Sequence, residues 1–189
     1  MQNYFSAFLR RVLLKMTRFM LTKLLATAWL CLMANGISAA TSISEAEYEN
    51  QIRKQLRPNL LIDLKSPEGD FVGIYRESAL AATQGGIIIV HDLDQNADSP
   101  QVISPLAEKL TEHGWSTLSL QMPVPIMDDA NSALTQLDRL FPGLSQQATA
   151  RIKAGIEHFL SENIENISIV GFGAGAKYAV TMMATPEGE

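Results

Sequence analysis

Three apolar runs along the chain have the character of buried β-strands. The run "GGIIIVHD" (Gly85–Asp92) contains four consecutive β-branched residues, which is typical of a strand covered on both faces of a parallel sheet. The run "WSTLSLQMP" (115–123), which Pro123 and Pro125 stop, and the run "ISIV" (167–170) are the next two expected strands. We therefore expect three buried strands that lie parallel to one another.

Between and after these runs, apolar residues recur with the spacing of helices. Val102, Leu106 and Leu110 mark one face of a helix, with Ser99 as its expected N-cap and Pro100 in its first turn. A further helix is expected over residues 174–183. Two other stretches share this spacing, a short one marked by Leu134, Leu137 and Leu140 and a longer one marked by Ile152, Ile156, Phe159 and Leu160.

The part of the chain before Gly85 follows a different pattern. Ser44 and Glu47 have the spacing of a capping box, and they predict a helix that Pro58 stops. The runs "NLLIDLK" and "FVGIYRE" then flank the turn residues 66–70, an arrangement that indicates a β-hairpin. An antiparallel hairpin is thus expected to precede the parallel strands.

Together these elements predict the α/β class, as a three-layer sandwich in which an antiparallel hairpin leads into a mostly parallel sheet with right-handed crossovers. The expected organisation is a leader over residues 1–40, an N-terminal helix and lead-in over 41–59, and one α/β domain over 60–189.

Residues 1–40 have the composition of a secretory signal. This segment holds five basic residues and no acidic one, followed by an apolar stretch (Leu24–Met33) and the small-residue sequence "ANGISAA". The apolar stretch is shorter than the ~20 residues needed to span a bilayer. We expect cleavage after Ala40 and export to the periplasm or the exterior, and the pair Arg10 and Arg11 leaves twin-arginine transport open.

Composition limits the possible partners of the exported part. Fifteen basic residues less the five in the leader leave ten, against twenty acidic residues, so the formal charge after cleavage is about −10. A strongly acidic domain is unsuited to nucleic acid, and we expect no contact with membranes beyond the export signal. The single cysteine, Cys31, lies in the leader, which excludes disulfide and thiol chemistry from the exported part.

The order of elements and two sequence segments resemble a known family. The stretch from "VHDLDQ" to "HGWSTLSLQMP", with the later "GFGAGA", is similar to an uncharacterised bacterial family of α/β-hydrolase-like proteins, a domain of unknown function. The resemblance runs from about Leu60 to the end of the chain. It implies the α/β-hydrolase fold, in which a nucleophile stands on a sharp strand-to-helix turn.

By this resemblance, the segment Gly171-Phe172-Gly173-Ala174-Gly175 stands where hydrolases carry G-x-S-x-G. Gly173 occupies the nucleophile position and has no atom that can attack a carbonyl, so no catalytic residue is expected. The resemblance also implies two backbone N–H donors of an oxyanion hole, one at Ala174 and one in the loop of His91, Asp92 and Leu93. These donors define a possible pocket at His91, Asp92 and Ala174 that would bind a ligand without cleaving it.

The segment after the turn is short. Hydrolases of this fold carry the acid and the histidine downstream of the nucleophile, on loops after later strands. Only fourteen residues follow Gly175 in this sequence, enough for one helix. We therefore expect an incomplete, C-terminally truncated version of the fold.

Two other motifs overlap these residues. Gly171, Gly173 and Ala176 fit the dinucleotide fingerprint G-x-G-x-x-[GA], but no acidic residue ends a following strand. The acidic run "DLDQNAD" imitates a calcium loop, yet Ala97 and Ile103 stand where such a loop needs glycine and glutamate. No metal site and no cofactor are predicted.

The sequence leaves three functions open. The first is an exported, non-catalytic hydrolase-like domain whose glycine turn is structural. The second is a part of a longer hydrolase-like enzyme acting on an ester or acyl substrate, in which His91 is the histidine to test. The third is a nucleotide-binding module. Sequence identifies no partner.

Overall fold

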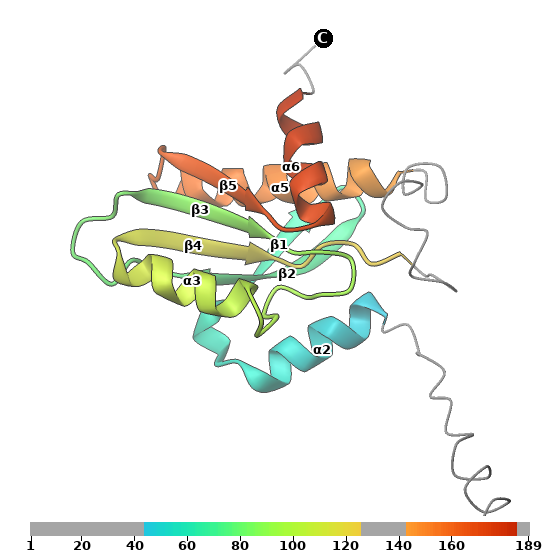
Figure 1. Cartoon of the computed structure of the whole chain (residues 1–189), viewed down its shortest axis with the longest axis horizontal. Helices are drawn as coiled ribbons and strands as arrows, with labels where there is room; N and C mark the ends of the chain where they lie inside the picture. The colour runs from blue at the N-terminus through green and yellow to red at the C-terminus, as the bar shows by residue number, and fades with distance from the viewer. Residues whose placement is uncertain (1–43, 126–142, 185–189) are drawn as a thin grey trace, which may run out of the picture. The chain divides into compact units, whose positions relative to one another are not determined.

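A five-stranded mixed sheet lies between two layers of helices in the computed structural model, which describes residues 44–125 and 143–184 (Figure 1). The expected leader and the short helical stretch marked by Leu134, Leu137 and Leu140 lie outside these residues. In chain order the elements are α2 (Glu45–Gln55), the 3₁₀ turn η1 (Pro58–Leu60), β1 (Leu61–Ser66), β2 (Gly69–Arg76), β3 (Gly85–Val90), α3 (Ile103–Glu112), β4 (Trp115–Leu120), α5 (Leu144–Ser161), β5 (Ile167–Gly171) and α6 (Ala174–Ala184).

The strand order β1-β2-β4-β3-β5 joins an antiparallel and a parallel half. The β1–β2 hairpin pairs Ser66 with Gly69 across a two-residue turn, and β2 is antiparallel to β4. Strand β3 then lies parallel to both β4 and β5. This confirms the α/β class and the hairpin that leads into a parallel sheet.

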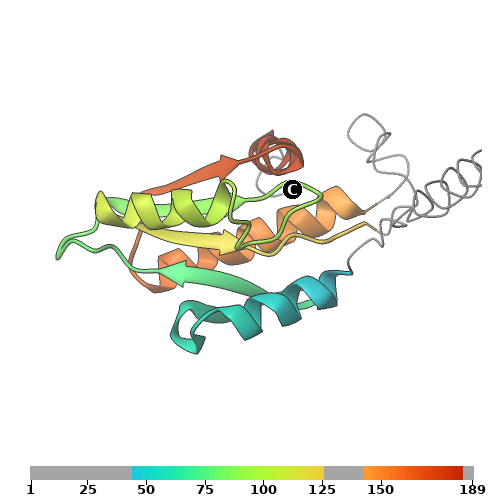
Figure 2. The ribbon, with the colours of Figure 1, turned by 60° about the horizontal axis from the view of Figure 1, so that its bottom comes forward.

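The helices cover both faces of the sheet (Figure 2). On one face α3 packs on Ile87 and Ile89, and α2 places Ile52 against Val72 and Ile74. On the other face α5 and α6 form the larger core. That core includes Phe71, Ile88, Val90, Leu118, Leu120, Ile152, Phe159 and Tyr178.

The start of the first crossover helix differs from the prediction. Helix α3 begins at Ile103 with Val102 as its N-cap, so the assignment of Ser99 as N-cap and Pro100 as first-turn residue was wrong. The hydroxyl of Ser99 accepts a hydrogen bond from the N–H of Asn96 (2.8 Å) and closes the preceding loop. Since this local bond satisfies the same hydroxyl that a cap would use, the helix starts later.

The structure confirms "ISIV" as a strand, but the prediction that it is a buried one was wrong. Strand β5 lies at the end of the sheet, where Ile167 and Ile169 face the core while Ser168 and Val170 are exposed. The apolar cluster under α3 includes Ile87 and Ile89 of the neighbouring strand β3 but no residue of β5. No helix among the described residues is long and apolar enough to cross a membrane.

Candidate functional site: a closed turn at the carboxyl edge of the sheet

The glycine turn lies at the carboxyl end of β5, directly beside the end of β3. Phe172 and Gly173 connect β5 to α6, and the N–H of Phe172 donates to the carbonyl of Val90 (2.9 Å). Gly173 adopts a left-handed conformation with φ of 57°, which glycine tolerates without strain. A side chain at Gly175 would overlap the carbonyl of Val90, so this close approach of helix and strand also requires glycine.

The carboxylate of Asp92 fills the space above this turn. Its Oδ1 atom accepts one hydrogen bond from the N–H of Leu93 and one from the N–H of Ala174, both at 2.8 Å. A Cβ atom at position 173 would overlap the same carboxylate. The space that a side chain at position 173 would enter is thus occupied by an acid of the chain itself.

The two N–H groups have the arrangement of an anion cradle. The structure brings Ala174 and the loop of His91, Asp92 and Leu93 together. Donors that converge on one oxygen at a helix N-terminus stabilise negative charge. Here Asp92 supplies that charge, so both donors are already paired.

His91 is buried beneath this loop and fully engaged. Its Nε2 accepts from the N–H of Met122 (2.9 Å), and its Nδ1 lies 2.6 Å from the carbonyl of Asp92, to which it donates as the Nδ1–H tautomer. Burial lowers the pKa of His91 to about 4, and the positive charge of Arg151 acts in the same direction. The imidazole is therefore neutral at pH 7, and a base role requires breaking a present hydrogen bond.

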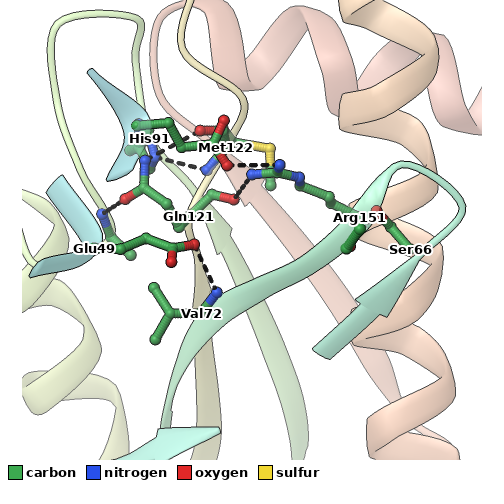
Figure 3. A network of polar contacts seen from close by, with 10 residues as sticks. Glu49, Ser66, Val72, His91, Gln121, Met122 and Arg151 are labelled. Carbon is green, nitrogen blue, oxygen red and sulfur yellow. Dashed lines mark hydrogen bonds and ion pairs between the residues drawn. The ribbon is translucent and has the colours of Figure 1, made fainter. Parts of the chain in front are cut away.

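A polar network continues from His91 toward α5 and α2 (Figure 3). Gln121 follows β4 and is fully buried; its side chain accepts from the N–H of Ala97 and donates to the carbonyl of Met122. Arg151 of α5 donates to the carbonyl of Gln121 (2.8 Å) and pairs with Glu45 of α2 (2.6 Å). These contacts join the carboxyl ends of β3 and β4 to two helices.

Sequence reasoning missed three members of this network, Gln121, Arg151 and Glu45. A signal was present for two of them. Gln121 is a polar residue at the end of an apolar run, and Arg151 stands next to Ile152 inside the buried stripe of α5. Glu45 gave no signal, because an acidic residue in the first turn of a helix is ordinary.

The acidic loop after β3 (residues 92–98) makes contacts with other parts of the domain. Asp98 pairs with the buried Arg76 (3.5 Å), and the carbonyl of Asp94 accepts from the hydroxyl of Tyr48. Within residues 44–125 and 143–184, no group of three or more His, Cys, Asp and Glu side chains is placed to hold a metal ion.

Comparisons with known proteins agree with the observed fold. The chain is similar to a cold-adapted esterase from an Arctic intertidal metagenomic library (TM-score 0.54, 14% identity, 70% of this chain and 59% of that one). It is also similar to an α/β hydrolase from Penicillium sp. sh18 (0.51, 12%, 67% and 42%) and an esterase from Pyrococcus furiosus (0.50, 13%, 67% and 45%). The chain thus spans about half the length of these solved structures. No curated protein matches it.

A family match covers residues 33–140, which is more than half of the chain. This range includes His91, Asp92 and Gln121 but not the glycine turn. The chain has the fold of the α/β-hydrolases and belongs to the family described as "Protein of unknown function (DUF3530)".

Proposed function

We propose that this chain is an exported, hydrolase-like domain that does not perform nucleophilic ester hydrolysis. One observation carries the proposal: Asp92 accepts hydrogen bonds from Leu93 and Ala174 in front of Gly173, a residue without a nucleophilic atom. An acyl-enzyme needs a side-chain nucleophile, and an oxyanion needs donors that are free to receive it. Asp92 competes for those donors, and its negative charge repels a developing oxyanion.

The same carboxylate argues against nucleotide binding at the turn. A pyrophosphate would have to lie at the N-terminus of α6, where Ala174 already donates to Asp92. Two negative groups at one helix end repel each other, so nucleotide binding is the least supported of the three functions.

The second candidate is a hydrolase-like enzyme, and the esterases among its structural neighbours favour it. In such an enzyme Asp92 would move away from Ala174, and polypeptide outside the described residues would supply the remaining groups. Substrates of that enzyme would be esters or related acyl compounds.

Turnover of p-nitrophenyl esters separates these candidates. We expect the wild-type protein to give no rate above a heat-inactivated control. Gly173→Ser alone is also expected to be inactive, because the new side chain meets Asp92. An authentic rate that disappears in His91→Gln, with the folded state retained, contradicts the non-catalytic proposal and supports the enzyme.

A binding measurement tests the nucleotide-binding alternative. Calorimetry with NAD is expected to show no heat of binding to the wild-type protein. Binding at micromolar affinity that is weakened by Ala176→Asp would restore the nucleotide-binding function.

A further inference from the structure

Helix α2 contacts the rest of the domain with few buried apolar side chains. Its one buried residue is Ile52. Its N-terminal half is held by polar contacts, since Glu45 pairs with Arg151 of α5 and Glu49 accepts from the N–H of Val72. Elements with few buried apolar contacts open at a lower free energy than the core of a domain. We therefore expect α2 to open locally while the sheet stays folded.

The guanidinium of Arg151 is oriented by groups outside α2. Its Nη1 donates to the carbonyl of Gln121 (2.8 Å), directly after β4 (Figure 3). Its Cζ lies 4.8 Å from the centre of the Phe71 ring on β2. The side chain belongs to α5 and is 9% exposed. Opening of α2 would thus leave the guanidinium in place and remove its carboxylate partner.

Glu45 uses one of two donors on the same edge of this guanidinium. Its Oε1 lies 2.6 Å from Nη2 of Arg151. The neighbouring Nε is buried and has no hydrogen-bond partner among the residues that the structure describes. Nε and Nη2 form the edge with which an arginine binds a carboxylate through two parallel hydrogen bonds. A buried donor without a partner is unfavourable, so a carboxylate that reaches both atoms would bind this edge better than Glu45 does.

The charge of Arg151 also favours a carboxylate. Among residues 44–125 and 143–184, Glu45 is the one acid that forms an ion pair with Arg151. When α2 opens, the guanidinium keeps the neutral carbonyl of Gln121 as an acceptor and loses its counter-charge. A largely buried charge without its partner is strongly unfavourable. The open state therefore attracts a carboxylate from outside the chain.

We propose that Arg151 is the centre of a binding site for an organic carboxylate, and that Glu45 of α2 closes this site by occupying it. The closed state presents no free edge to a ligand, whereas the open state presents Nε and Nη2 together. A ligand that binds the open state alone raises the population of that state. None of the groups that define the site belongs to the glycine turn, so the site does not depend on whether the domain hydrolyses esters.

Hydrogen exchange of the full chain, followed by mass spectrometry, tests the site. The probe is propionate, which has the shape of a glutamate side chain, and it is compared with sodium chloride at equal ionic strength. We expect propionate to accelerate exchange in α2, because it binds the open state alone. The strands β3 and β4 are expected to keep their exchange rates.

Three variants assign the response to this site. Glu45→Gln is expected to bind propionate on the order of tenfold more tightly than the wild-type protein, because weaker closure raises the fraction of chains that are open. Glu47→Gln is the matched control, since Glu47 lies in the same first turn but is exposed. Arg151→Lys keeps the positive charge but lacks the two-donor edge, and it is expected to remove the response to propionate.

The proposal is overturned if propionate changes the exchange of α2 in neither the wild-type protein nor Glu45→Gln. It is also overturned if chloride produces the same change, or if the response persists in Arg151→Lys. Should Arg151→Lys not fold, the comparison of Glu45→Gln with Glu47→Gln decides, because equal affinities for propionate in these two variants contradict closure by Glu45.

Discussion

Asp92 has two structural roles in this domain. Its carboxylate caps the first turn of α6 through Ala174, and it orders its own loop through the N–H of Leu93. Both bonds have a charged acceptor, which makes them stronger than bonds between neutral groups. The side chain therefore stabilises the turn while it closes the cradle.

Removal of this carboxylate is expected to destabilise the domain. Asp92→Ala leaves two N–H groups without their acceptor and should lower the free energy of unfolding by about 1–3 kcal/mol in urea denaturation. Asp92→Asn keeps an oxygen acceptor and should lose less. The exposed residue Asp94 provides the control, since Asp94→Ala is expected to change stability by less than about 0.5 kcal/mol. Equal losses in Asp92→Ala and Asp94→Ala would contradict the role of Asp92.

His91 makes stability depend on pH. Burial holds its pKa at about 4 in the folded protein, below the ordinary value of 6.5. Between these values the unfolded chain binds a proton that the folded chain does not, so acidification favours unfolding. The contribution of His91 to the free energy of unfolding is fully present above about pH 6.5 and is lost as the pH falls toward 4. The total loss is about 3 kcal/mol.

The variant His91→Gln isolates this contribution, because glutamine retains an acceptor for the N–H of Met122. We expect the wild-type protein to lose more stability than His91→Gln between pH 7 and pH 4.5, measured by urea denaturation at each pH. If the free energy of unfolding falls equally with pH in both proteins, His91 is protonated as readily in the folded chain as in the unfolded one. That result would contradict the lowered pKa of His91.

At the scale of elements, α2 is held against the carboxyl ends of the central strands by its own polar side chains. Glu45 pairs with Arg151, and Glu49 accepts from the N–H of Val72 (3.3 Å). Arg151 is 9% exposed and also lies over the ring of Phe71, 4.8 Å from its centre. A short helix with one buried residue, Ile52, depends on such contacts.

Loss of the Glu45 carboxylate leaves the buried guanidinium of Arg151 without its charged partner, although its bond to the carbonyl of Gln121 remains. Glu45→Gln is expected to lower the free energy of unfolding by about 1–3 kcal/mol. The reason is that a neutral amide replaces the carboxylate that is paired with the largely buried guanidinium of Arg151. Glu47→Gln is the matched control, since Glu47 lies in the same first turn but is exposed. Both variants alter the helix dipole interaction alike, so equal effects would rule out the Arg151 contact as the cause.

At the scale of the whole molecule, the domain begins close to the proposed cleavage point. Ser44 caps α2 by accepting from the N–H of Glu47 (3.3 Å), four residues after Ala40. Thr41, Ser42 and Ile43 stand between them in the sequence.

Export is tested by intact mass and N-terminal sequencing of the protein recovered from the periplasm of a bacterial host. We expect a chain that starts at Thr41. Ala40→Phe is expected to block processing, because the cleavage site requires small residues, while Ser42→Phe lies beyond those positions and serves as control. Recovery of the full-length chain in the cytoplasm would contradict the proposed export.

Local sequence determined the elements of this protein because their signals are local. β-Branched runs specify β3, apolar spacing specifies α5, and the capping box at Ser44 specifies the start of α2. The order of these elements was enough to predict the α/β class and the hairpin that joins the parallel strands. Gly173, which we propose to stand in the place of a nucleophile, is likewise visible in the sequence.

Tertiary structure decided what these residues do. The bond between Asp92 and Ala174 joins positions 82 residues apart, and no spacing rule relates them. The exposure of Val170 follows from the place of β5 at the end of the sheet, whereas its apolar composition alone indicates burial. A residue's neighbours along the chain determine its backbone conformation, but its partners across the sheet exist only once the strands have paired.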